Sequence, residues 1–373
     1  MTVENEKWMR YVLSLARKGW GKTNPNPLVG CALVKDNQLV AEGFHAALGQ
    51  HHAERAAIDE ANKKGINLEG VTLYVNLEPC VHHGRTPPCA QYMIDSGIKS
   101  VVIAMSDPNP LMAGKGIAML REAGINVITG VLETEAVKLN EIFIKYITTG
   151  LPFILMKTAI TIDGKIASNR GDSRWISGEA SRSVVHHWRQ RMSGIMVGAN
   201  TVLIDNPSLT TRLSETESIN PTRIIIDGHA RLSLDQKVFR KDEPSNVILA
   251  TTSSLDQRKK DEFEAAGVEI VCLENDQGQV DLHALCSCLG QKGLDSIMLE
   301  GGGRLNEAFL RAGLIDKIML FMAPKIMGGS QSVSCFFGEG IEKMSDAVRV
   351  SDMTVAACGE DWLIQGYPVY GED

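Results

Sequence analysis

The chain has 373 residues, of which 44% are hydrophobic, so it is long enough for two domains with separate cores. Its formal net charge is −7 and it contains no basic block, which argues against a nucleic acid as the main partner, although a small phosphate can still be bound locally. No segment approaches the roughly 20 apolar residues of a membrane helix, and the first residues lack the basic and apolar regions of a secretion signal, so we expect a cytoplasmic protein without a membrane partner.

Residues 1–149 alternate between predicted helices and strands, which is typical of a layered α/β domain. The chain opens with an amphipathic helix whose apolar positions include Trp8 and Val12. Strands are expected at residues 29–35, 39–42, 71–76, 100–105 and 126–129, and the first two form a hairpin with Asp36 and Asn37 in its turn. Helices are expected at residues 52–64, 89–96, 117–122 and 133–147.

The most specific pattern in this region is His52 with Glu54, followed by Cys80 and, after eight further residues, Cys89. His52, Cys80 and Cys89 supply three zinc ligands, whereas a structural zinc site uses four, so water can take the fourth position. Zinc lowers the pKa of such a water to about 7, and Glu54 is then free to carry its proton. The pattern resembles the His-x-Glu and Pro-Cys-x-x-Cys signature of zinc-dependent nucleobase deaminases, apart from the longer spacing between the cysteines.

Each of these cysteines follows a proline, Pro79 or Pro88, and proline favours the start of a helix. We therefore predict that both sulfurs lie at helix N-termini, where the helix dipole stabilises a thiolate. Alternative ligands are His51, which the motif disfavours, and His82 and His83, which suit a substrate pocket better. The other cysteines are scattered among apolar residues and are expected to be reduced thiols.

Gly150 and Pro152, in residues 148–152, are expected to end the last predicted helix. We therefore predict a domain boundary here, with a first domain of residues 1–149 and a second of residues 150–373. The second domain also alternates between predicted strands and helices. Strands are expected at residues 153–159, 195–197, 223–227, 247–250, 296–299 and 317–323, and helices at residues 179–191, 255–266 and 305–312. The two halves share no motif, so we expect them to have different chemistries.

Three glycines, Gly301 to Gly303, connect the predicted strand at residues 296–299 to the helix at residues 305–312. Glycines at such a turn let a phosphate approach the backbone N–H groups of the helix N-terminus. The turn lacks the Gly-x-Gly-x-x-Gly pattern, so a Rossmann dinucleotide site is not indicated. A tight turn with a purely structural role is an equal alternative.

Five further segments make the chain similar to a known family. Residues 158–165, 173–177 and 197–207 resemble the dihydrofolate-reductase-like reductases of riboflavin synthesis, and residues 24–30 and 82–88 distinguish the first half from cytidine and tRNA deaminases. From Trp8 to about Ile364 the chain resembles the bifunctional deaminase/reductases of riboflavin biosynthesis.

This resemblance implies a cytidine-deaminase-like three-layer α/β domain followed by a dihydrofolate-reductase-like α/β domain. It implies Zn²⁺ and NADPH as cofactors, a small phosphorylated pyrimidine as substrate, and a homo-oligomer. The first domain would deaminate 2,5-diamino-6-(5-phosphoribosylamino)pyrimidin-4-one. The second would then reduce the ribosyl side chain to give 5-amino-6-(5-phosphoribitylamino)uracil.

The resemblance also assigns binding residues. Asn26, His45 and Arg85 would contact the deaminase substrate. NADPH would lie beside Ala159, Trp175, Thr201, Asp205, Gly302, Gly303, Arg304, Leu305, Asn306, Glu307 and Ala308. The ribosyl phosphate would be bound by Ser173, Arg189, Leu209, Arg212 and Glu300. Guanidinium groups match phosphate oxygens, which gives Arg189 and Arg212 a physical reason for this role.

Some residue roles stay open. Arg189 shares its predicted helix with other arginines, so a solvated basic face is an alternative. His186, in the same helix, is predicted to have a surface or packing role, since the sequence offers it no partner. Asp205 and Glu300 are the titratable candidates for the proton donor of the reductase, and Lys157 is a further option.

Two other classes of protein fit the sequence less well. A nucleoside or tRNA deaminase with an accessory domain is disfavoured by the net charge of −7 and by the spacing of Cys80 and Cys89. A zinc-stabilised nucleotide sensor without turnover is disfavoured by Glu54, because a structural zinc ion gains nothing from this carboxylate.

Overall fold

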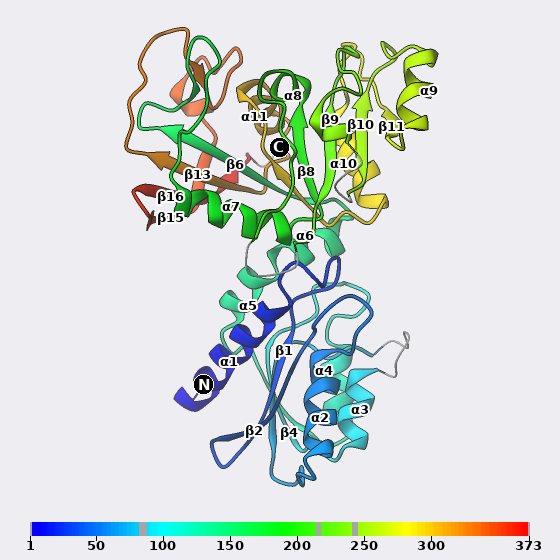
Figure 1. Ribbon diagram of the computed structural model, residues 1–373. Coiled ribbons are helices and arrows are strands. Elements are labelled where there is room, and N and C mark those ends of the chain that lie inside the picture. The colour runs from blue at the N-terminus through cyan, green and yellow to red at the C-terminus, as the bar shows by residue number, and fades with distance from the viewer. Residues whose placement is uncertain (1, 82–87, 214–217, 241–244, 372–373) are drawn as a thin grey trace. The chain divides into compact units, whose positions relative to one another are not determined.

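The computed structural model of the protein describes residues 2–81, 88–213, 218–240 and 245–371. Contacts along the chain divide it into two compact units, Met1–Gly150 and Leu151–Asp373. Each unit contains one large β-sheet with helices packed against it (Figure 1). None of the helices in these described ranges is long and apolar enough to cross a membrane.

A five-stranded sheet in the order β2-β1-β3-β4-β5 forms the centre of the first unit. Its strands are β1 (Gly30–Lys35), β2 (Gln38–Phe44), β3 (Thr72–Leu77), β4 (Ser100–Met105) and β5 (Asn126–Thr129). Strand β1 is antiparallel to β2 and β3, whereas β3, β4 and β5 are parallel. Helices α1 (Val3–Ala16) and α5 (Glu133–Leu139) cover one face, and α2 (Ala53–Lys63), α3 (Cys89–Asp95) and α4 (Lys115–Glu122) cover the other (Figure 1). The predicted layered α/β architecture is confirmed.

Local sequence explains how α2 is placed on this sheet. Asp36 and Asn37, in the predicted turn between β1 and β2, have positive φ angles of 50° and 56°, which a two-residue hairpin turn requires. Further along β2, a Cβ atom on Gly43 would lie 2.4 Å from the Ala53 carbonyl oxygen. Glycine at this position therefore lets the first turn of α2 pack directly against the strand.

The single helix predicted at residues 133–147 is wrong, because the structure has two helices, α5 and α6 (Glu141–Thr149). Asn140 separates them with a non-helical backbone conformation. Its side chain accepts a hydrogen bond from the Leu28 N–H at 2.8 Å and donates one to the Leu28 carbonyl at 3.0 Å. Since the partner is 112 residues away, no local pattern reveals this break.

A nine-stranded sheet in the order β11-β10-β9-β8-β12-β6-β13-β16-β15 forms the second unit. Its strands are β6 (Phe153–Thr161), β8 (Gly194–Gly198), β9 (Thr222–Ile226), β10 (Val247–Thr251), β11 (Glu269–Cys272), β12 (Ser296–Leu299), β13 (Lys317–Ala323), β15 (Arg349–Cys358) and β16 (Asp361–Val369). The sheet is parallel from β11 to β13, and only β16 and β15 are antiparallel. The carboxyl ends of the parallel strands thus share one edge, where α/β proteins usually bind ligands.

The helices of this unit are α7 (Glu179–Arg191), α8 (Ala199–Asp205), α9 (Gln257–Ala265), α10 (Leu282–Gln291) and α11 (Gly303–Arg311), and a small sheet pairs β7 (Lys165–Ala167) with β14 (Val333–Ser334). Helix α7 was predicted with these bounds. Helix α9 is shorter than predicted because Asp256 caps it, accepting from the Lys259 N–H at 2.8 Å. Helices α8 and α10 and strands β7, β11, β14, β15 and β16 were not predicted.

Candidate active sites

The three predicted zinc ligands converge in the first unit. His52 Nδ1 lies 3.5 Å from Cys80 Sγ and 3.3 Å from Cys89 Sγ, and all three donor atoms lie within 4.8 Å of one another. Tetrahedral zinc with its usual bond lengths separates nitrogen and sulfur ligands by roughly 3.5 Å. One imidazole and two thiolates are also donor types that zinc prefers, so both the geometry and the donor set fit this ion.

Helix starts position two of these ligands. His52 is the N-cap of α2, and Cys89 is the first residue of α3, directly after Pro88. Cys80 lies in the loop after β3, so the helix start predicted at Pro79 is wrong. The Cys89 backbone N–H nevertheless donates to Cys80 Sγ at 3.4 Å. The Cys89 side chain first, and then His52, lower the pKa of Cys80 to about 4, which favours a thiolate.

A buried carboxylate, Glu78, fixes the loop that carries Cys80. Its oxygens accept hydrogen bonds at 2.8 to 3.1 Å from the backbone N–H groups of Asp107, Gly114, Gly116 and Ile117. A Cβ atom on Gly116 would lie 2.1 Å from the Pro79 carbonyl oxygen, so the first turn of α4 packs against the loop itself. The position of the ligand loop is therefore tied to the N-terminus of α4.

Glu54 lies in the first turn of α2 and is only 4% exposed. Burial first, and then the charge of the Cys80 thiolate, raise the pKa of its carboxyl group to about 7. A carboxyl group with a pKa near neutrality can both accept and release a proton, as general acid–base catalysis requires. This environment suits the proton-carrying role predicted for Glu54.

Asn26 and His45, the predicted substrate contacts, lie together beside the metal ligands. Asn26 Nδ2 is 3.2 Å from His45 Nε2, and the ring of His45 meets that of His52 edge to face at 5.6 Å. The side chain of His51, the alternative zinc ligand, pairs instead with Asp59 on the surface of α2, with Nδ1 3.4 Å from Oδ2. Arg85, His82 and His83 lie outside the described residues.

A cavity of about 1290 Å³ opens in the second unit at the carboxyl ends of β6, β8, β9 and β12. Pockets for one small molecule usually measure roughly 300 to 1,000 Å³, so this cavity has room for a dinucleotide and a second ligand. Most of the predicted cofactor and substrate residues line it: Ala159, Ser173, Trp175, Arg189, Thr201, Asp205, Arg212, Glu300, Gly302, Gly303, Arg304, Leu305 and Ala308.

Three predicted binding residues have other surroundings. Leu209 is 4% exposed and packs in a hydrophobic core. Asn306 Nδ2 donates to the Cys335 carbonyl at 2.9 Å, which holds the neighbouring segment against α11. Glu307 pairs with Arg311 one turn further along the same helix, at 2.8 Å. None of these three is among the described residues that line the cavity.

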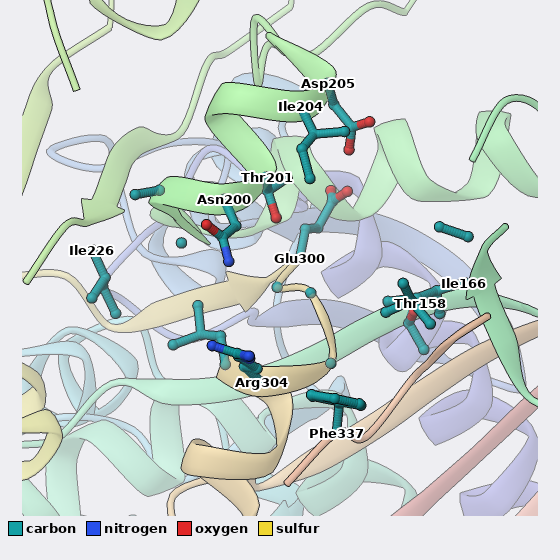
Figure 2. A pocket seen from close by; sticks show the side chains of 18 of the residues that line it. Thr158, Ile166, Asn200, Thr201, Ile204, Asp205, Ile226, Glu300, Arg304 and Phe337 are labelled. Atoms are coloured by element: carbon teal, nitrogen blue, oxygen red, sulfur yellow. The ribbon is translucent and has the colours of Figure 1, made fainter. Parts of the chain in front are cut away.

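The glycine turn predicted after β12 forms one wall of the cavity. Helix α11 begins at Gly303 with Gly302 as its N-cap, and a Cβ atom on Gly302 would find its nearest neighbour, Thr201 Oγ1, at 3.7 Å. Figure 2 shows Thr201 extending from α8 and Arg304 from the start of α11. The open N-terminus of α11 faces space that a phosphate group of a dinucleotide can occupy.

Glu300 is the centre of a buried ion cluster on the cavity wall. Arg189 donates to both carboxylate oxygens, at 2.8 and 3.1 Å, and Lys157 Nζ donates to Glu300 Oε2 at 3.4 Å. Burial alone would raise the pKa of Glu300, but the two cations lower it to about 2. The solvated basic face considered for Arg189 is therefore wrong, since this side chain is only 12% exposed.

Some cavity residues were missed by sequence reasoning. His186, for which a surface or packing role is predicted, is half-buried and lines the cavity. The signal was present, because Arg182, Val185, His186 and Arg189 follow helical spacing and all line the cavity. Asn200 and Arg231 also line it, joined by a hydrogen bond of 2.7 Å. Asn200 lies in the segment 197–207 that resembles the reductases, but nothing in the local sequence marks Arg231.

Comparisons with known proteins agree with this division of the chain. Residues 152–364 match the RibD C-terminal domain, and residues 2–105 match the cytidine and deoxycytidylate deaminase zinc-binding region. The riboflavin biosynthesis protein RibD of Actinobacillus pleuropneumoniae is 43% identical over 97% of this chain and 95% of its own.

Two solved structures are similar over nearly the whole chain. RibD of Acinetobacter baumannii has a TM-score of 0.87 and 35% identity, covering 98% of this chain and 99% of its own. The diaminohydroxyphosphoribosylaminopyrimidine deaminase/5-amino-6-(5-phosphoribosylamino)uracil reductase of Thermotoga maritima has a TM-score of 0.87 and 40% identity, with the same coverage. The predicted pairing of a cytidine-deaminase-like and a dihydrofolate-reductase-like domain is confirmed, and the chain belongs to the family of bifunctional riboflavin-biosynthesis deaminase/reductases.

Proposed function

We propose that the protein deaminates 2,5-diamino-6-(5-phosphoribosylamino)pyrimidin-4-one in its first unit and reduces the ribosyl side chain in its second, giving 5-amino-6-(5-phosphoribitylamino)uracil. The observation that carries the first step is the convergence of His52, Cys80 and Cys89 beside the buried carboxyl group of Glu54. The second step is supported by the large cavity at the sheet edge of the other unit.

In the deamination, His52, Cys80 and Cys89 would hold the zinc ion. Zinc, when bound, makes a water molecule acidic enough to supply hydroxide at neutral pH. Glu54 would accept the proton from the attacking water and pass it to the amino group, which departs as ammonia. Its pKa of about 7 suits both halves of this transfer. Asn26 and His45 lie where they can orient the pyrimidine ring.

In the reduction, NADPH supplies the hydride, and the protein orients the reactants. Hydride addition to C1 of the open imine form of the substrate requires a proton on the adjacent nitrogen. Glu300 is ionised at neutral pH, because its pKa is about 2, and it is therefore a poor donor of that proton. Lys157 lines the cavity and carries protons on Nζ, so it is the stronger candidate, with Asp205 as the alternative.

The proposal is tested by incubating the zinc-loaded protein with the diaminopyrimidinone ribosyl phosphate, with and without NADPH. Mass spectrometry should find the deaminated ribosyl product without NADPH and the deaminated ribityl product with it. NADH in place of NADPH tests the choice of cofactor. Deamination alone would contradict the function proposed for the second unit.

A homo-oligomer in the cytoplasm is part of the same proposal, with a small-molecule substrate and no nucleic acid partner. Met353 and Val355 on the edge strand β15, and Trp362 on β16, are exposed apolar side chains that a second copy could cover. The free cysteines suit a reducing compartment, and the net charge of −7 does not favour a polyanion. Light scattering after size-exclusion chromatography would measure the oligomeric state.

A further inference from the structure

One face of α7 forms part of the wall of the reductase cavity. Arg182, Val185, His186 and Arg189 line the cavity, and their spacing places them on one side of the helix. Arg189 is committed to Glu300 and to the Thr210 carbonyl, which accepts from Nη1 at 2.9 Å. His186 lies one turn before Arg189, and the mechanism proposed above does not use it.

The protonation of His186 follows from one hydrogen bond. The backbone N–H of Arg212 donates to His186 Nδ1 at 3.3 Å, so this nitrogen must be unprotonated. In a neutral imidazole the proton then lies on Nε2. Among the described residues, Nε2 of His186 has no hydrogen-bond partner. Because His186 lines the cavity, its Nε2–H group can donate a hydrogen bond to a ligand there.

The charges around the ring keep it neutral. Burial first, and then Arg189 and Arg212, lower the pKa of His186 to about 4, with Lys157 acting in the same direction and Glu300 opposing it. Three cations and one carboxylate therefore surround the imidazole. Their charges leave this part of the cavity with an excess of two positive charges, which matches a phosphate monoester dianion.

We propose that His186 binds the phosphate group of the ribosyl phosphate substrate through Nε2–H, while its Nδ1 holds Arg212 beside the same group. The inference rests on the reductase function proposed above and adds a binding residue to it. A neutral imidazole contributes a hydrogen-bond donor without adding a further cation to the cluster. Arg212 is exposed and also lines the cavity, and its side chain supplies positive charge.

Two substitutions of His186 distinguish the role of its Nδ1 from the role of its Nε2. The amide oxygen of His186→Asn can replace Nδ1 as the acceptor for Arg212, but this side chain is too short to replace Nε2–H. The amide N–H of His186→Gln lies where Nε2–H does. We expect His186→Asn to raise the KM for the deaminated ribosyl phosphate by about 10-fold or more, with a smaller change in kcat, and His186→Gln to retain most of the affinity.

A phosphate probe shows which part of the substrate His186 contacts. Inorganic phosphate should inhibit the wild-type reductase competitively and His186→Asn more weakly by a similar factor. With the substrate lacking its phosphate, the KM values of the wild type and His186→Asn should be equal. His187→Asn is the matched control, because His187 is exposed and does not line the cavity, and its Nδ1 lies 2.9 Å from the Ser183 carbonyl oxygen in the same helix.

The proposal is overturned if His186→Asn has the wild-type KM, since His186 would then act only by holding Arg212 through Nδ1. It is also overturned if His186→Gln raises the KM as much as His186→Asn does, since a donor at the position of Nε2 would then make no difference. Calorimetric unfolding of the second unit, which contains His186, reports whether each variant is folded. A wild-type protein that binds phosphate in the second unit but reduces nothing would contradict the proposed function and leave the phosphate contact standing.

Discussion

At the scale of single residues, each candidate site contains a buried carboxyl group whose pKa is shifted by its surroundings, and the shifts at Glu54 and Glu300 are opposite. Burial dominates at Glu54 and raises its pKa to about 7. At Glu300 the neighbouring cations dominate and lower the pKa to about 2. Glu54 can therefore exchange protons near neutral pH, whereas Glu300 is a fixed negative charge.

We expect Glu54→Gln to abolish ammonia release while zinc remains bound. The substitution keeps the shape of the side chain but removes the group that transfers the proton, which usually contributes about 10²- to 10⁴-fold to the rate. Atomic absorption would measure the zinc content, and an ammonia assay the turnover. Reduction of the separately supplied ribosyl intermediate should be unchanged. Surviving deamination would disprove the role of Glu54.

We expect Glu300→Gln to destabilise the second unit by roughly 3 kcal/mol at neutral pH, because Arg189 and Lys157 remain buried without a counter-charge. The pKa of Glu300 in the folded protein, about 2, lies below its usual value of 4.5. Its contribution is thus fully present above about pH 4.5 and is lost as the pH falls toward 2.

Chemical denaturation at pH 7 and at pH 3 would measure this difference between the wild type and Glu300→Gln. The difference should be smaller at pH 3. Glu264→Gln is the control, since Glu264 forms an exposed pair with Lys260 at 3.9 Å and its loss should change stability by less than about 0.5 kcal/mol. An equal difference at both pH values would contradict the argument.

Residue roles could be predicted where the chemistry depends on local spacing. His52, Glu54, Cys80 and Cys89 form such a pattern, and the structure brings the three ligand atoms together. The role of His186 could not be predicted in this way. It depends on Arg212, which is 26 residues away and meets the imidazole only in the folded unit.

At the scale of elements, the N-terminus of α4 positions the zinc ligand loop through Glu78. We expect Glu78→Gln to weaken zinc binding by about 10-fold or more, because an amide cannot accept hydrogen bonds from all four N–H groups that now point at the carboxylate. Competition with a chromogenic chelator would measure the zinc affinity.

The spectrum of the Co²⁺-loaded protein would show whether Glu78→Gln also alters the coordination of Cys80 and Cys89. Glu69→Gln is a matched control in the same unit, since Glu69 is exposed. Unchanged zinc affinity and an unchanged cobalt spectrum in Glu78→Gln would show that the contact with α4 does not position the loop.

The order of elements could be predicted from apolar periodicity, but some boundaries and edge strands could not. Asn140 splits a helix through hydrogen bonds to Leu28, which only the folded unit provides. Strand β15 was missed because most of its residues are exposed, so the strand lacks the alternation of a half-buried one. A local sequence pattern cannot predict packing between distant segments or the exposure of a strand at a sheet edge.

At the scale of the whole molecule, the zinc ligands all come from one unit and the cavity residues from the other. We therefore expect removal of zinc by a chelator to abolish deamination and to lower the unfolding temperature of the first unit only. Reduction of the separately supplied intermediate should continue at its original rate, and added zinc should restore deamination. Calorimetry and the two activity assays would check this. Loss of both activities would show that the units are coupled.

The asparagines that hold Leu28 also determine when the deaminase site can be completed. Asn76 Nδ2, like Asn140 Nδ2, donates to the Leu28 carbonyl, and Asn140 Oδ1 accepts from the Leu28 N–H. Leu28 lies two residues after Asn26, which faces the metal ligands through His45. During synthesis, all three zinc ligands emerge from the ribosome about fifty residues before Asn140 does. The nascent chain can thus collect its three proposed metal ligands well before Asn140 can fix the segment next to Asn26, a proposed substrate contact.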